Sequence, residues 1–339
     1  MANIKDYKIA TLASHTALQI LKGAKDEGFE TIAICQKGKR KPYESYNVAD
    51  EIIEVEKFED YFEIEQQLID KNAIVIPHGS FVSYLGFENV KKIKAMHYGN
   101  RDIIEWESDR DMERKWLLDA GLNMPKIFKN PKDIDRPVII KFHGAGGGKG
   151  YFIANNPDEF YKRLEGNPDA EKGYAIQEYI VGVPIYTHYF QSPVTGELEI
   201  MSFDKRYESN ADSIGRIAAK DQIDVGIQTT YTITGNLPLV VRESLLPKIF
   251  EMGEGVVEAS KKIVDGGLWG PFCLEAIVDP NLDFFVFEIS ARIVAGTNPF
   301  TNGSPYSWLR YNEPMSTGRR LSRDIKEAIE KDKLEEVLG

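Results

Sequence analysis

The chain has 339 residues, of which 42% are hydrophobic and 28% charged, with a formal net charge of −11 at pH 7. These values are typical of a globular protein with two or three domains, and the acidic balance argues against a broad nucleic-acid surface. No apolar run approaches the roughly 18 residues of a membrane span, and the N-terminus lacks a signal-peptide pattern. We therefore expect a cytoplasmic protein that binds no nucleic acid and no membrane, with Cys35 and Cys273 as buried thiols.

The first hundred residues alternate between strand and helix patterns. Two polar turns, at 14–16 and 78–80, follow predicted strands. Such a series is typical of a small doubly wound α/β domain with a parallel sheet, whose ligands bind beyond the carboxyl ends of the strands. The predicted strands are 8–13, 29–35, 51–55 and 73–77, with helices over 16–28 and around 59–71.

The pattern changes after residue 100. Ser108, with Asp111 three positions on, predicts a helix start, and Gly121 predicts its end. A long helix over 244–264, a hairpin around 279–283 and a charged C-terminal helix complete the chain. We expect a first domain over 1–100 and a second, of α+β character, over 101–339, which divides near residue 185 into a central and a C-terminal subdomain. Between the helix that ends at Gly121 and the long helix, mainly antiparallel strands are predicted at 136–142, 150–155, 174–180, 184–191, 196–208 and 227–233.

The stretch KFHGAGGGKGYF (141–152) joins two of these strands. It is not a Walker A motif, in which Ser or Thr follows the lysine, and G-x-G-x-x-G fits it in no frame. Because both flanks have strand patterns, the loop is expected to close a hairpin. It is either a mobile glycine turn or a flexible lid whose amides and Lys149 close over phosphates, with Lys141 reaching from the preceding strand.

A second hairpin, within 273–292, carries two glutamates. If it turns symmetrically on its Asn-Leu pair, Val278 pairs with Phe285 and Glu275 with Glu288. Like charges at that spacing in apolar strands call for a cation between them, and carboxylates together with nucleotide phosphates are how Mg²⁺ is usually held. The alternative is a strand face that is open to water.

Two further signals accompany the glutamates. Alternation along the second strand puts Ser290 and Arg292 on the face of Glu288, where the arginine can meet phosphate or a developing anion. The stretch YAIQEYIVG (174–182) is either an ordinary strand or one whose backbone C=O and N–H groups meet an adenine edge.

The lysine loop, the QEYI stretch and the paired glutamates together resemble the ATP-grasp superfamily over roughly residues 100–310. The stretches TLASHTALQILKGAKDEGF, HGSF, GNLPLVVRESLLPK and FEISARIVAGTNPFTNGSPYS look like the archaeal formate-dependent 5-formaminoimidazole-4-carboxamide ribonucleotide synthetases of purine (IMP) biosynthesis. This resemblance covers nearly the whole chain. It implies an ATP-grasp fold preceded by a small doubly wound parallel α/β domain.

The resemblance also implies an ATP-dependent carbon–nitrogen ligase. ATP would phosphorylate formate to formyl phosphate, which the amino group of 5-aminoimidazole-4-carboxamide ribonucleotide (AICAR) attacks. The products would be the 5-formamido ribonucleotide (FAICAR), ADP and phosphate. Such a reaction needs no side-chain nucleophile, because the intermediate is already activated and the protein must position substrates, neutralise charge and exclude water.

Roles carried over from the family fall on matching positions of this sequence. Glu275 and Glu288 would bind Mg²⁺ or Mn²⁺, and Lys149 and Arg292 would be catalytic. Glu178 and Ile180 would bind adenine through their backbone, and Glu208 the ribose. The expected ATP-binding residues are Lys141, Gly146, Gly147, Lys149, Gln177, Glu178, Tyr179, Ile180 and Glu208, and the expected AICAR-binding residues are His15, Ser80, Asn236, Thr297 and Asn298.

One departure from the superfamily pattern concerns the metal site. Many members carry Asn two residues after the second glutamate, where this chain has Ser290. The alternatives to the formate ligase are an ATP-grasp ligase that activates a larger carboxylate, and a purine-nucleotide-binding protein without turnover. The apolar segment PYSWLRY (305–311) and the edge strands suggest self-association as a homo-oligomer.

Overall fold

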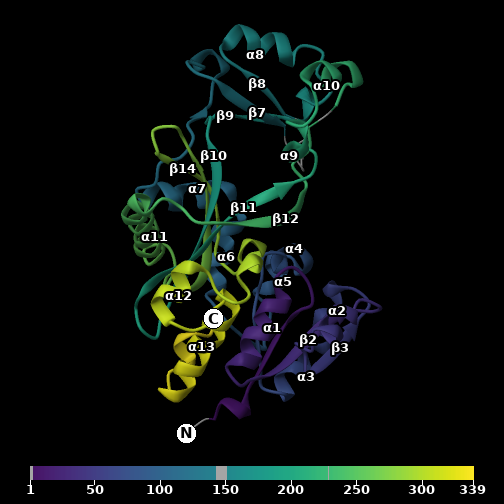
Figure 1. The fold of residues 1–339 in the computed structure, drawn as a ribbon, viewed down its shortest axis with the longest axis vertical. Helices are drawn as coiled ribbons and strands as arrows, with labels where there is room; N and C mark the ends of the chain where they lie inside the picture. The colour runs from purple at the N-terminus through teal and green to yellow at the C-terminus, as the bar shows by residue number, and fades with distance from the viewer. Residues whose placement is uncertain (1–2, 143–150, 228) are drawn as a thin grey trace.

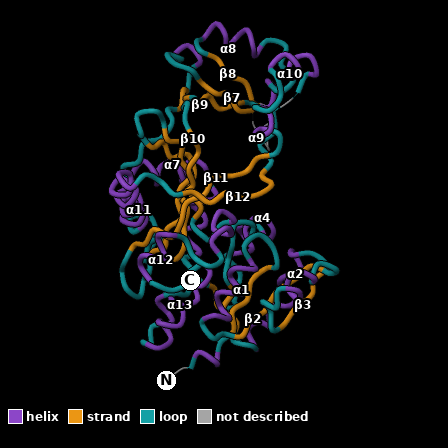
Figure 2. Tube along the Cα trace, viewed as in Figure 1, coloured by secondary structure: helices purple, strands orange, loops and turns teal. Residues whose placement is uncertain are grey.

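The computed structural model describes residues 3–142, 151–227 and 229–339, so Gly146, Gly147 and Lys149 of the predicted loop lie outside the described residues. Three sheets follow one another along the long axis of the molecule (Figure 1, Figure 2). No helix among the described residues is both long enough and apolar enough to cross a bilayer. Cys35 and Cys273 are buried free thiols, as predicted.

The N-terminal sheet has the order β3-β2-β1-β4-β5, and its strands are parallel, which confirms the doubly wound prediction. Its central strands are buried on both faces because helices cover both faces of such a sheet. The strands are β1 (Lys8–Leu12), β2 (Glu30–Gln36), β3 (Glu51–Val55), β4 (Ala73–Val75) and β5 (Met96–His97). The helices are α1 (Ala17–Asp26), α2 (Lys41–Ser45), α3 (Tyr61–Asp70), α4 (Phe81–Leu85) and α5 (Phe87–Val90).

The predicted helix start at Ser108 is wrong. Ser108 is the last residue of α6 (Arg101–Ser108), and α7 (Arg110–Asp119) begins after Asp109. The Asp109 carboxylate accepts hydrogen bonds from the backbone N–H groups of Asp111 and Met112, at 3.0 and 2.9 Å, and so caps α7.

The central sheet is antiparallel, with the order β12-β11-β10-β13-β14. The strand predicted at 227–233 is wrong, because β12 only begins at its last residue. Next to the start of β12, Ser209 N–H donates to the Thr232 carbonyl at 2.7 Å. The strands are β10 (Val183–Gln191), β11 (Leu198–Glu208), β12 (Ile233–Leu239), β13 (Gly270–Val278) and β14 (Phe284–Ser290), with α11 (Leu246–Ser260) against the sheet.

The third sheet, with the order β6-β9-β7-β8, forms the lobe at one end of the molecule (Figure 1). Strands β7 and β8 flank residues 143–150 and pair in antiparallel fashion, so the predicted hairpin is confirmed. The elements of this lobe are β6 (Ile127–Phe128), β7 (Val138–Phe142), β8 (Tyr151–Ala154), β9 (Tyr174–Glu178) and α8 (Pro157–Leu164), and between β11 and β12 lie α9 (Ala211–Ile214) and α10 (Ala219–Val225).

The two ends of the chain pack against each other. Helix α13 (Thr317–Glu330) lies along α1, and a Cβ atom at Gly318 would overlap the Gln19 carbonyl oxygen. Leu338 forms an isolated bridge with Tyr98, just beyond β5. The C-terminus therefore completes the packing of the N-terminal sheet. The remaining elements are α12 (Pro305–Tyr311) and the 3-10 helices Ile4–Asp6, Phe58–Asp60, Pro131–Asp133, Ala170–Lys172, Glu243–Leu245, Ala295–Phe300 and Leu334–Glu336.

Candidate active site

A cavity of about 190 Å³ lies where the central sheet meets the carboxyl end of the N-terminal sheet. The N-terminal sheet contributes residues from the turns after β1 and β4, and the central sheet contributes one face of its strands. The chain between β14 and α12 covers it. The lining residues are His15, Gly79, Tyr186, His188, Asp204, Arg206, Ile233, Asn236, Cys273, Glu275, Glu288, Ser290, Arg292, Val294, Ala295 and Gly296.

The predicted pairing of Glu275 with Glu288 is confirmed, although the predicted register of the hairpin is wrong. Val278 pairs with Phe284 instead of Phe285, so the turn is one residue out of the expected symmetry. A bulge between Glu275 and Ala276 then restores the register. The two carboxylates therefore share a row on one face of the sheet.

Glu275 is only 2% exposed, and its Oε2 atom has no hydrogen-bond partner among the described residues. Burial, and then the charge of Glu288, raises its pKa to about 7. Its Oε1 atom forms an ion pair with Arg206, whose guanidinium also lies 4.1 Å from the centre of the Tyr186 ring. The guanidinium of Arg206 thus compensates part of the charge of the buried Glu275 carboxylate.

The glutamate pair fits a divalent cation that takes two protein carboxylates. The described residues contain no group of three or more His, Cys, Asp or Glu side chains that could hold a metal by themselves. A cation on Glu275 and Glu288 would therefore complete its shell with water or phosphate oxygens, which is usual for Mg²⁺. Such a cation would give the unpartnered Oε2 atom of Glu275 a positively charged partner.

Arg292 reaches the cavity from beyond β14 and is held from behind by Glu107 of α6. Its Nη2 lies 2.6 Å from Glu107 Oε1, and Glu107 Oε2 accepts the N–H of Ala291 at 3.0 Å. Burial raises the pKa of Glu107, and the charge of Arg292 opposes that rise. The Nε and Nη1 atoms of Arg292 are buried without a partner among the described residues. Glu107 therefore orients the guanidinium and leaves its remaining donors for a ligand.

We expect Glu107→Gln to lower kcat about ten-fold with little change in the KM for ATP, because an amide leaves either the guanidinium or the Ala291 N–H without an acceptor. Steady-state kinetics measure both constants. Glu105→Gln is the matched control, since Glu105 lies on the same helix in an exposed ion pair with Lys91. Equal effects of the two substitutions would contradict this role for Glu107.

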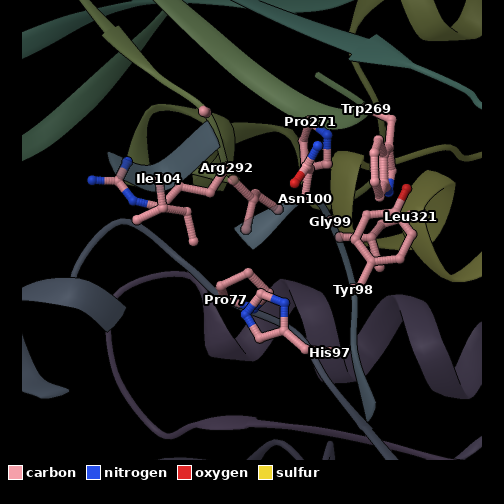
Figure 3. Close-up of a pocket in the computed structure, with 12 residues that line it drawn as sticks. Pro77, His97, Tyr98, Gly99, Asn100, Ile104, Trp269, Pro271, Arg292 and Leu321 are labelled. Atoms are coloured by element: carbon pink, nitrogen blue, oxygen red, sulfur yellow. The ribbon is translucent and has the colours of Figure 1, made fainter. Parts of the chain in front are cut away.

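Behind Arg292 lies a second, much smaller pocket of about 10 Å³ (Figure 3). Both ring nitrogens of His97 are buried there without a partner among the described residues. Burial, and then Arg101, lowers the pKa of His97 to about 3, so the ring is neutral. The pocket has room for about one water molecule and is no substrate site.

His15, a predicted AICAR-binding residue, stands in the cavity wall in a left-handed backbone conformation with φ of 54°. Its ring stacks on His78, with 5.4 Å between the ring centres, and a Cβ atom at Gly79 would lie 2.5 Å from it. Burial, and then Arg292 and Arg206, lowers the pKa of His15 to about 4. At neutral pH this imidazole is therefore an uncharged hydrogen-bonding group.

Of the other predicted AICAR-binding residues, only Asn236 lines the cavity. Ser80 precedes α4, and its N–H donates to His78 Nδ1 at 3.2 Å. Gln19 of α1 donates to Thr297 Oγ1, at 2.5 Å, and to Asn298 Oδ1, at 2.9 Å. Thr297 and Asn298 therefore hold the wall in place from outside.

The predicted phosphate-binding Lys141 lies on β7, where its Nζ donates to Gln177 Oε1 of β9 at 3.0 Å. Burial, and then Arg110, lowers the pKa of Lys141, and the charge of Glu288 opposes the change. The third sheet thus carries its lysine close enough to the glutamate pair to interact with Glu288.

The predicted adenine contacts are only in part free to act. Glu178 N–H donates to the Lys126 carbonyl at 2.8 Å, and Tyr179 N–H to the Pro137 carbonyl at 2.9 Å. The Glu178 side chain accepts Lys126 N–H at 3.0 Å and pairs with Arg136 at 3.0 Å. The N–H of Glu178 is thus already bonded to Lys126, and adenine contacts of the Glu178 carbonyl and of the Ile180 backbone stay predictions.

Glu208, the expected ribose ligand, ends β11 beyond the cavity wall. Its backbone N–H donates to the Asp212 carboxylate. Burial, and then the charge of Asp212, raises the pKa of Glu208. Its carboxylate is half-buried and stays a predicted contact of the nucleotide.

The residues of the site that the sequence analysis missed include Asp204, Arg206, His188 and Glu107. The alternation of SFDKRY could have placed Asp204 and Arg206 on one face of a strand. Nothing local indicates that Glu107, on a helix far away in sequence, meets Arg292.

The sequence matches two family models, and the fold matches solved structures of other proteins. Residues 9–128 match a family model described as "Protein of unknown function (DUF1246)", and 165–339 match "Domain of unknown function (DUF1297)". A solved structure of N5-carboxyaminoimidazole ribonucleotide synthetase, in complex with ADP, superposes with a TM-score of 0.65 at 12% identity, over 94% of this chain and 76% of that one. At this identity the likeness shows the fold alone, and that fold is the ATP-grasp fold which the sequence resemblance predicted.

More similar proteins narrow the class. A relative from Pyrococcus abyssi is 56% identical over 98% of both chains, and one from Methanocaldococcus jannaschii is 48% identical over 99% of this chain and 96% of the relative. The crystal structure of an IMP biosynthesis protein, PurP, from Thermococcus kodakaraensis has a TM-score of 0.80 at 32% identity, over 98% of this chain and all of that one. The chain belongs to the family of 5-formaminoimidazole-4-carboxamide-1-(beta)-D-ribofuranosyl 5'-monophosphate synthetases.

Proposed function

We propose that the protein converts AICAR, formate and ATP into FAICAR, ADP and phosphate through formyl phosphate. The observation that carries the proposal is the pair Glu275 and Glu288, which faces a cavity shared by both ends of the chain. Family membership supports the ribonucleotide substrate.

The cavity suits a phosphorylated ribonucleotide at its His15 end. Arg292 and Arg206 are both close enough to act on the pKa of His15. Helix α1 begins just after Thr16, whose Oγ1 is buried without a partner among the described residues. A neutral imidazole, two guanidinium groups and a helix N-terminus together favour a phosphate.

The chemistry follows from positioning and charge. A formate oxygen attacks the γ-phosphorus and ADP leaves. The amino nitrogen of the ribonucleotide then attacks the formyl carbon, the bond from that carbon to the phosphate oxygen breaks, and the nitrogen loses a proton. Lys141 and Arg292 would neutralise the phosphate oxygens in both steps. A divalent cation on Glu275 and Glu288 would supply further positive charge to the ATP phosphates.

The test is ADP release with the ribonucleotide, ATP and Mg²⁺, with and without formate. We expect ADP to appear only when formate is present, together with equal amounts of the formamido product by mass spectrometry. ADP release that does not depend on formate would contradict the proposal. A larger carboxylate that replaces formate with a higher kcat/KM would favour the alternative ligase.

A cytoplasmic location and self-association belong to the same proposal. Trp308 and Leu309 of α12 are 50% and 82% exposed, which supports a contact between copies through this helix.

A further inference from the structure

We propose that Asp204 is a positioning residue that makes the cavity select a ribonucleotide with a carboxamide over one with a carboxylate in the same place. The inference rests on the proposed function and adds to it the chemical group that the site reads. It follows from the way one buried carboxylate fixes the orientation of its two neighbours, His188 and Asn236.

Asp204 is 1% exposed and uses both of its oxygens. His188 Nε2 lies 2.7 Å from Asp204 Oδ1, and Asn236 Nδ2 lies 2.7 Å from Asp204 Oδ2. An ionised carboxylate only accepts hydrogen bonds, so the ring N–H and the amide NH₂ must point at it. The Asn236 amide therefore cannot turn over without setting two oxygens against each other.

This orientation decides that the cavity wall presents a hydrogen-bond acceptor at Asn236, and not a donor. Because its NH₂ is held by Asp204, Asn236 leaves its Oδ1 atom to the cavity, and this oxygen has no partner among the described residues. Close packing keeps the arrangement rigid, since a Cβ atom at Gly296 would lie 2.6 Å from the His188 ring. The wall thus combines a carbonyl acceptor with the negative charge of Asp204.

A carboxamide and a carboxylate differ in the atoms that such a wall distinguishes. The carboxamide offers an N–H group to Asn236 Oδ1, whereas a carboxylate would set an anionic oxygen against an acceptor and near a second carboxylate. Arg206 lies on β11, two residues after Asp204 and opposite Asn236, but its guanidinium is paired with Glu275. Arg292, beyond β14, keeps two buried nitrogens without a partner among the described residues, so the group left for phosphate differs from the acceptor that Asn236 offers to an N–H donor. A site that is built around one hydrogen bond rejects the wrong partner strongly.

The experiment compares the binding of two ribonucleotides by calorimetry, the 5-aminoimidazole 4-carboxamide and the 5-aminoimidazole 4-carboxylate. We expect the wild-type protein to prefer the carboxamide by about 100-fold or more. In Asp204→Asn, the His188 N–H keeps the oxygen of the new amide, whose NH₂ then faces Asn236. Asn236 must turn its oxygen inward and present NH₂ to the cavity, so we expect the preference to fall to about ten-fold or less. A merely structural role would not move this ratio.

Two further variants cover the case in which Asp204→Asn does not fold. Asn236→Ala removes the acceptor from β12 without touching the buried carboxylate, so carboxamide binding should weaken about ten-fold. Ser202→Ala is the control, because Ser202 lies two residues before Asp204 on β11, is buried and does not line the cavity. The Ser202→Ala variant should prefer the carboxamide over the carboxylate as strongly as the wild type does.

The outcomes separate the two proposals. If the wild-type protein turns over the carboxamide with formate but both Asp204→Asn and Asn236→Ala keep its preference, the role of Asp204 is overturned while the proposed function stands. If the wild-type protein binds neither ribonucleotide and releases no formate-dependent ADP, the proposed function itself fails. A lowered preference in both variants with an unchanged KM for ATP supports the inference.

Discussion

Glu288→Gln is expected to lower kcat about a thousand-fold or more while the protein remains folded. The substitution removes one of the two carboxylates that fit the cation, and a loss of about 4 kcal/mol of transition-state stabilisation corresponds to that factor. The fold should survive because Glu288 is exposed and its removal relieves the like charge that helps to raise the pKa of Glu275. Formate-dependent ADP release measures the effect.

The control is Asp283→Asn, an exposed carboxylate at the turn of the same hairpin. It should keep wild-type kcat, and both variants should unfold near the wild-type temperature. Raising the Mg²⁺ concentration should restore part of the Glu288→Gln activity if the lost carboxylate acts on a cation. Wild-type turnover by Glu288→Gln would refute the metal assignment for this pair.

Gly318→Ala is expected to destabilise the protein by about 2 to 3 kcal/mol, the upper range for overpacking a close contact. The new Cβ atom would overlap the backbone of Gln19, and a backbone atom cannot move aside as the end of a flexible side chain can. Helices α1 and α13 must therefore separate. A melting temperature lowered by about 5 °C or more would record this.

The same substitution should raise the KM for the ribonucleotide more than that for ATP. Gln19 bonds Thr297 and Asn298, and Asn298 donates to the His15 carbonyl at 3.1 Å, so a shift of α1 moves the wall around His15. Gly215→Ala is the control, because an added Cβ atom there meets nothing within 4 Å. Equal losses of stability in the two variants would show that the α1–α13 contact is not tight.

The sequence predicted those parts of the structure that depend on local pattern. Largely apolar segments marked β1, β2 and β4, because a parallel sheet covered by helices needs continuous burial, whereas β3 lies at the edge of the sheet and is buried only in part. The prediction of β12 failed for a physical reason. Gly235 and Pro238 weaken its strand pattern, yet an edge strand tolerates both.

The glutamate pair was predicted by a sound argument with a wrong intermediate step. A bulge at Glu275 compensates for a turn that is one residue out of symmetry, and bulges leave no clear signal in a sequence. The residues that pair with the predicted site residues were still harder to predict from the sequence. The contacts of Glu107 with Arg292 and of Arg206 with Glu275 join segments far apart in the chain, so only the tertiary fold defines them.

Two isolated β-bridges join the first hundred residues to the C-terminal part of the chain, and they limit which segments a chimera of two relatives could exchange. His78 pairs with Ile293 at the cavity, and Leu338 pairs with Tyr98 at the sheet edge. A chimera that swaps only residues 1–100 would therefore join a foreign first domain to a native α13, across a contact with no space for a methyl group. A transferable unit would therefore be discontinuous, and it would comprise the first hundred residues together with the segment from Ile293 to the C-terminus.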